Sequence, residues 1–261
     1  MRKRIGRLVD LYRTKLKKKK YLSDFIKTSK NYLPVMVFQM GKVASSSIYY
    51  SIKNTYKGKV IHFHSFDNKD ESFSIKTFYN YSVLDKQPTK IITLTREPVS
   101  RNISAFFQNF ETITGKPFAD SLYTIDELRT IFLENKKMNH YEPITWFEDN
   151  LLKNYNIDIY EKSFPHEGWQ TLKKGNISVL IMKSEIDNGL KESLIKSFLN
   201  CEEFILSKHN IGEDKEYAAV YKKFRDSVKL PGEYLDRMLN SKYAQHFYTL
   251  KEIENSRNKR L

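Results

Sequence analysis

Three groups of side chains in this sequence could bind an anion and move a proton. Lys42 and the run Ser45–Ser47 follow one apolar stretch, and Arg96 follows another. Lysine and arginine bind phosphate or sulfate oxygens as full charges, and serine hydroxyls donate hydrogen bonds to the same oxygens. His62 and His64 lie two residues apart, and histidine readily exchanges a proton near neutral pH. These residue types indicate a site for an anionic ligand with a proton-transfer group beside it.

The lysine and the serines belong to a strand, loop and helix pattern. The apolar run Val35–Phe38 is typical of a buried parallel strand, and Ile48 and Ile52, four residues apart, indicate a helix after the serines. A helix N-terminus presents unpaired N–H groups and a partial positive charge, so it is suited to bind an anion. The predicted anion-binding residues of this loop are Gly41, Lys42, Val43, Ala44, Ser45, Ser46 and Ser47.

Apolar runs alternate with helical patterns along the rest of the chain. Strands are expected at 35–38, 60–64, 91–95 and 177–182, and helices from 45, at 98–110, 124–155, 190–199, 217–228 and 231–254. This alternation predicts an α/β fold, a P-loop-like three-layer sandwich with a central, mostly parallel sheet and helices on both faces. Ligands of such folds bind at the carboxyl ends of the strands, where the loop and Arg96 are expected. Residues 65–88 show no clear period.

Charge is concentrated at the N-terminus. The chain of 261 residues has 45 Lys and Arg against 31 Asp and Glu, a net charge of +14. Residues 1–20 hold ten basic side chains and one acid, which gives 10 − 1 = +9 and leaves +5 for the remainder. We therefore predict a basic, amphipathic arm at 1–30 and a single domain at 31–261, and expect no nucleic-acid partner. The arm is either a solvated tail or a peripheral contact with an anionic membrane or a partner.

Other classes of protein are disfavoured by what the sequence does not contain. No apolar stretch approaches the ~18 residues of a membrane span, and the N-terminus has no apolar core of a secretory signal. A single cysteine, Cys201, excludes an internal disulfide and a cysteine-cluster zinc site. We expect a cytoplasmic protein, with the inner membrane face as the place of any membrane contact.

The loop departs from the Walker A pattern of nucleotide triphosphatases, G-x-x-x-x-G-K-[ST]. Gly41 and Lys42 are present, but Val43 stands where the Mg²⁺-binding Ser or Thr belongs, and Met36 replaces the first Gly. We therefore expect no metal at the site.

Two motifs carry a resemblance to a known superfamily. Lys42–Ser46 resembles the 5′-phosphosulfate loop of sulfotransferases, K-x-[GA]-[ST]-[ST], and Arg96–Ser104 resembles their later motif R-[DE]-P-x-x-R-x-x-S. The chain is thus similar to sulfotransferases that use 3′-phosphoadenosine-5′-phosphosulfate (PAPS). Three further segments resemble a bacterial sulfotransferase-like family of capsular polysaccharide synthesis proteins: Trp146–Asp149, Asn156–Tyr160 and Gln245–Tyr248.

The resemblance implies PAPS as the donor and a hydroxyl of a glycan or lipid-linked glycan as the acceptor. It assigns the donor's 3′-phosphate to Arg96 and Ser104, and Arg101 shares the helical face of Ser104. A late loop that folds over the donor is expected to contribute Lys215.

The catalytic residues are expected among Lys42 and the two histidines. Lys42 would stabilise the leaving phosphate. His64 is the preferred general base because it lies closer to the carboxyl end of its strand, and His62 is either its orienting neighbour or the second choice.

Two alternatives stay open. A P-loop-type kinase would require Mg²⁺ ligands that the sequence does not offer. A non-catalytic protein that binds membrane or nucleic acid is supported by the basic arm alone.

Overall fold

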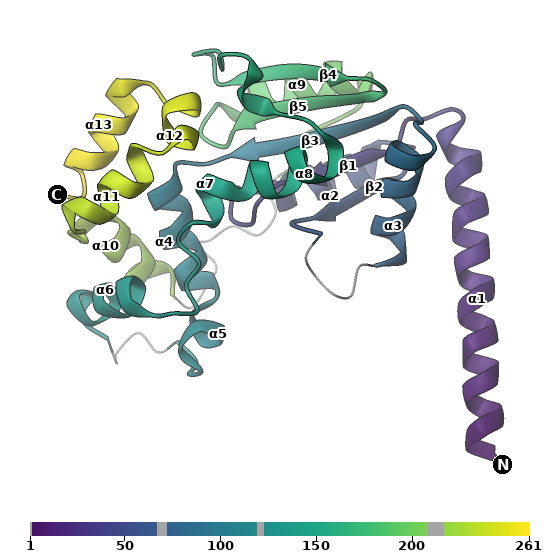
Figure 1. Cartoon of the computed structure of the whole chain (residues 1–261), viewed down its shortest axis with the longest axis horizontal. Helices are drawn as coiled ribbons and strands as arrows, with labels where there is room; N and C mark the ends of the chain where they lie inside the picture. The colour runs from purple at the N-terminus through teal and green to yellow at the C-terminus, as the bar shows by residue number, and fades with distance from the viewer. Residues whose placement is uncertain (1, 67–71, 119–122, 208–216) are drawn as a thin grey trace.

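The structure, a computed structural model, describes residues 2–66, 72–118, 123–207 and 217–261. Its centre is a five-stranded sheet in the order β2-β1-β3-β5-β4 (Figure 1). The strands are β1 (Val35–Phe38), β2 (Val60–Phe63), β3 (Thr89–Thr95), β4 (Trp169–Lys174) and β5 (Ile177–Lys183). β1 pairs in parallel with both β2 and β3, and β3 pairs in parallel with β5. The predicted α/β fold with a mostly parallel sheet is confirmed.

The chain reverses its direction across the sheet at β1. It passes from β1 to β2 on one side and then returns to β3 on the other. Such a reversal opens a crevice beyond the carboxyl ends of the two strands that flank it, and ligands of open α/β sheets bind there. The loop after β1 and the residues after β3 therefore lie at the crevice.

Helices cover both faces of the sheet. The helices before β4 are α1 (Arg2–Ser29), α2 (Ser45–Thr55), α3 (Phe73–Tyr79), α4 (Pro98–Gln108), α5 (Phe110–Thr114), α6 (Ile125–Glu134), α7 (Glu142–Phe147) and α8 (Lys153–Tyr155). Right-handed crossovers place α2 and α3 on opposite faces because the chain moves in opposite directions after β1 and after β2. On the α3 face, Tyr155 of α8 donates a hydrogen bond to Met36 Sδ (3.3 Å), and its ring lies 5.9 Å from that of Tyr79.

Two elements were not expected from the sequence. β4 is an antiparallel edge strand that joins β5 through a turn at Gly175, where φ is +58°. Its pattern is half-exposed and ends in two lysines, as in edge strands that must not pair further. α3 forms within 65–88, where Ser72 caps it by accepting from Ile75 N (3.2 Å). The π-helical turns Asn80–Leu84 and Glu148–Leu152 continue α3 and α7.

The predicted long helices are divided. The stretch 124–155 forms α6, α7 and α8, and 231–254 forms α11 (Gly232–Leu239), α12 (Lys242–Phe247) and the start of α13 (Leu250–Asn258). Ser241 and Thr249 begin α12 and α13 by accepting from backbone N–H groups three residues on. Separate caps let the short helices turn and pack instead of continuing along one axis. The predicted helices at 190–199 and 217–228 are α9 (Asn188–Leu199) and α10 (Ala218–Ser227).

The N-terminal arm is one helix, α1, that extends away from the sheet (Figure 1). Its last turns pack against the body, where Phe25 is fully buried. In the described part of the chain, no helix combines the length and the apolar character that crossing a bilayer requires.

Candidate functional site

The loop between β1 and α2 has an unusual backbone. Lys42 and Ala44 adopt positive φ angles of 73° and 62°, a conformation that costs a non-glycine residue roughly 1–2 kcal/mol. The side chain of Val43 between them is fully buried and anchors the loop to the core. Ala44 occupies the N-cap of α2 but makes no side-chain capping bond. The N–H groups in the first turn of α2 therefore donate no hydrogen bond to the side chain at the N-cap.

A cavity of about 350 Å³ lies beside this loop. It is lined by Gly41, Lys42, Ala44, Ser45, Ser46, His64, Arg101, Gln108, Asn109 and Glu142. The cavity therefore brings together the loop, one of the two histidines and the far end of α4. Val43, Ser47, His62, Arg96 and Ser104 lie outside its lining, and the predicted contact Lys215 lies outside the described residues.

Arg101 holds the wall of this cavity in place. Its guanidinium is buried, and Nε donates to Gly41 O (3.0 Å) while Nη1 donates to Asn102 Oδ1 (3.2 Å). Nη2 forms an ion pair with Glu142 Oε2 at 2.5 Å. Because all three nitrogens have protein partners, Arg101 fixes the loop and Glu142 relative to α4. The sequence offered no signal for Glu142, which reaches the site only because α7 packs beside α4.

Arg96 is bonded to the backbone of the loop. Its Nη1 donates to Lys42 O (2.8 Å), and its own backbone N and O are bonded to the hydroxyl of Tyr243 at 3.0 and 2.9 Å. Ser104 is half-buried on α4, one turn before Gln108. Lys42 Nζ donates to Gln108 Oε1, which links the loop to the end of α4.

His64 is held as one defined tautomer. It follows β2 directly, since the strand ends at Phe63 and not at residue 64 as the sequence suggested. Its Nδ1 donates to Gln39 O at 2.8 Å. A carbonyl oxygen only accepts, so the proton of neutral His64 is on Nδ1 and the lone pair is on Nε2. His64 is exposed at the cavity, where Nε2 can accept a proton.

His62 has a different environment. Its Nε2 lies 3.0 Å from both Ser45 Oγ and Gln39 Nε2. Burial, with a smaller contribution from the charge of His64, lowers the pKa of His62 to about 4. His62 is therefore neutral at physiological pH and acts as a hydrogen-bond partner that orients Ser45. Its ring centroid lies 4.8 Å from that of His64, so the two histidines are neighbours as expected.

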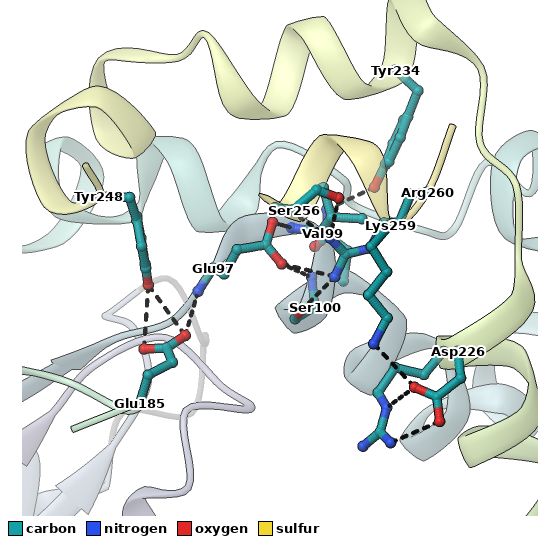
Figure 2. Close-up of polar contacts among 12 residues, drawn as sticks. Glu97, Val99, Ser100, Glu185, Asp226, Tyr234, Tyr248, Ser256, Lys259 and Arg260 are labelled. Atoms are coloured by element: carbon teal, nitrogen blue, oxygen red, sulfur yellow. Dashed lines mark hydrogen bonds and ion pairs between the residues drawn. The ribbon is translucent and has the colours of Figure 1, made fainter. Parts of the chain in front are cut away.

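The C-terminal helices fasten the start of α4 (Figure 2). Glu97 caps α4 by accepting from Val99 N (2.9 Å) and Ser100 N (2.8 Å). The buried Arg260 donates from Nη2 to Glu97 Oε2 (3.0 Å) and Ser100 Oγ (2.6 Å). The Glu-Pro pair at 97–98 was readable as a helix start, whereas Arg260 was not expected to take part.

Glu185, just past the end of β5, ties the same region to α12. It accepts from Glu97 N at 2.9 Å and from the hydroxyl of Tyr248 at 3.3 Å (Figure 2). The residues after β3 are thus held from both sides, by β5 and by the C-terminal helices.

Fold and site together define an α/β protein in which the loop after β1 and His64 after β2 line one cavity. Residues 119–249, half of the chain, match the family described as "Putative capsular polysaccharide synthesis protein". The chain belongs to this family. No curated protein and no solved structure gives a significant match. The matched residues include Glu142, Glu185 and Tyr248, while the loop and Arg96–Ser104 precede them.

Proposed function

We propose that the protein is a PAPS-dependent sulfotransferase that acts on a hydroxyl of a carbohydrate in surface polysaccharide synthesis. The observation that carries the proposal is the cavity itself. Lys42, Ser45, Ser46 and the exposed His64 line one space at the carboxyl ends of β1 and β2. An anion-binding loop and a proton acceptor must share such a space for a sulfuryl group to pass to a hydroxyl.

In the proposed reaction the acceptor oxygen attacks sulfur in line with the bond to the 5′-phosphate. The new S–O bond forms as the old one breaks, and the acceptor proton passes to His64 Nε2. The products are a sulfate ester and adenosine 3′,5′-bisphosphate. Lys42 stabilises the negative charge that collects on the leaving phosphate.

The donor would be held by the loop and by α4. Its 5′-phosphosulfate would take the place of a cap at the N-terminus of α2, where the Ala44 side chain supplies none. By the resemblance to sulfotransferases, the 3′-phosphate would be bound by Arg96 and Ser104, which lie outside the lining of the cavity. Arg101 would act by holding Gly41, because its guanidinium nitrogens already have protein partners.

The alternative of a Mg²⁺-dependent kinase finds no support at the position that would bind the metal. Val43 is apolar and fully buried there. Among the described residues, no group of three or more His, Cys, Asp or Glu side chains could hold a metal ion.

Binding of adenosine 3′,5′-bisphosphate is the first test. Isothermal titration calorimetry in the presence of EDTA should show binding by the wild type and strongly weakened binding by Lys42→Ala. The exposed Lys136 gives a matched control, because Lys136→Ala should bind like the wild type. Tighter binding of Mg-ATP than of the bisphosphate would overturn the proposal in favour of a kinase.

Turnover is the second test. A screen of glycan acceptors with PAPS should identify a sulfated product, and His64→Ala should lower kcat by about 10²–10⁴-fold with the affinity for bisphosphate unchanged. His166→Ala, at an exposed histidine, should have wild-type turnover. Full turnover of His64→Ala would remove His64 as the base.

A further inference from the structure

The helix α1 has a surface that the body of the protein does not cover. Phe25 is fully buried, and its ring lies 4.9 Å from that of Phe78 and 5.1 Å from that of Tyr81. The ring centroids of Tyr21 and Phe73 lie 5.8 Å apart. These contacts fix the last turns of α1, while the preceding turns extend beyond the body (Figure 1). A helix of 28 residues is about 40 Å long.

Four large apolar side chains of α1 are exposed. They are Tyr12 (64 % exposed), Leu16 (49 %), Leu22 (42 %) and Ile26 (47 %), which we call the apolar stripe. At 100° per residue these positions fall within an arc of about 120°. The packed residues Tyr21 and Phe25 lie about 180° and 220° from Tyr12 on the same count. The helix thus has two apolar faces, and the body covers only one of them.

Lysines accompany the stripe. Lys15, Lys17, Lys19 and Lys20 are all exposed, within a segment of ten basic residues and one acid at 1–20. Lysine stems can lie along apolar surface while their ammonium groups stay in water. On the same count Lys15 and Lys19 fall within the arc of the stripe, and Lys17 and Lys20 lie outside it. An exposed apolar stripe with lysines within and beside it matches the boundary of an anionic bilayer, where acyl chains meet phosphate headgroups.

We propose that α1 lies on an anionic membrane surface, with the apolar stripe in the bilayer boundary and the lysines on its headgroups. A second copy of the chain would bring another strongly basic segment against the first and repel it. A nucleic acid would match the charge but leave the stripe in water. An anionic lipid surface satisfies both features, and the proposal does not depend on the reaction at the cavity.

Co-sedimentation of the full chain with vesicles tests this proposal. We expect binding to phosphatidylcholine vesicles that contain phosphatidylglycerol and none to phosphatidylcholine alone. The combined variant Lys15→Gln, Lys17→Gln, Lys19→Gln and Lys20→Gln should bind at least about 100-fold more weakly, because each lysine near the surface contributes severalfold. A control with four other exposed lysines replaced, Lys162→Gln, Lys173→Gln, Lys222→Gln and Lys223→Gln, should bind nearly as the wild type does.

A second variant separates insertion from charge attraction. Leu16→Gln, Leu22→Gln and Ile26→Gln together keep the charge and suit a helix, and they should weaken binding by about 10-fold or more. Unchanged binding of this variant would overturn the proposal, as would equal loss in both lysine variants. Self-association that depends on the stripe, or tighter binding of duplex DNA than of vesicles at the same salt, would also overturn it. Circular dichroism verifies that each variant retains its helix.

Discussion

Acid should destabilise the protein through His62. Burial lowers the pKa of His62 from 6.5 to about 4, so between these values the unfolded chain binds a proton that the folded chain does not. The stabilisation is fully present above pH 6.5 and is lost as the pH falls to 4. A pKa lowered from 6.5 to about 4 corresponds to about 3 kcal/mol, of which about 2 kcal/mol is lost between about pH 7.5 and pH 5.

Urea unfolding of the wild type and of His62→Gln at the two pH values measures this effect. His140 and His246 also have pKa values lowered by burial, so only the difference between wild type and variant isolates His62. We expect the wild type to lose about 2 kcal/mol more than the variant between the two pH values. An NMR titration of the histidine rings should place the midpoint of His62 near 4.

Equal acid losses in wild type and variant would refute the reasoning. A ring titration of His62 close to its ordinary 6.5 would do so as well. Either result would mean that His62 takes up a proton within the folded protein. It could then no longer serve as the neutral partner of Ser45.

Three further predictions concern how the site is held, each read from the free energy of unfolding in urea. Arg260→Ala should lower the free energy of unfolding by about 3 kcal/mol, because it leaves the half-buried Glu97 carboxylate without a cation. Lys174→Ala, which removes a pair whose side chains are 48 % and 57 % exposed, should lower it by less than about 1 kcal/mol. Similar losses in the two variants would contradict a special role for Arg260. Ala44→Gly should stabilise the protein by about 1 kcal/mol, because glycine adopts the positive φ of this position without strain. Ala105→Gly, within α4, should destabilise it by a similar amount. A loss of stability in both variants would show that the loop is not strained. Phe25→Ala should cost about 3–5 kcal/mol, and a negligible loss would show that α1 is not fixed to the body.

The sheet and its main strands could be predicted from local pattern. β1, β3 and β5 are almost entirely buried, and each contains an apolar run that stands out from its polar neighbours: Val35–Phe38, Ile91-Ile92 with Leu94, and Val179–Met182. In β3 the buried threonines Thr89, Thr93 and Thr95 flank or interrupt that run. β4 could not be recognised in the same way, because an edge strand alternates and Trp169–Lys174 mixes one aromatic with lysines. The helical stretch 231–254 was divided at Ser241 and Thr249, where side-chain caps begin new helices. A helical period by itself does not reveal such a change of axis.

The order of residue types determined which side chains could take part in anion chemistry and roughly where they would meet. Lys42, the serines and His64 all follow apolar strands, and parallel strands end at the same edge of a sheet. Only the tertiary structure decided how each is used. It left His62 half-buried against Ser45 and His64 exposed at the cavity, and it gave Arg101 three protein partners. Burial and hydrogen bonding depend on chain segments that are distant in sequence, such as Glu142 and Arg260, so no local pattern can encode them.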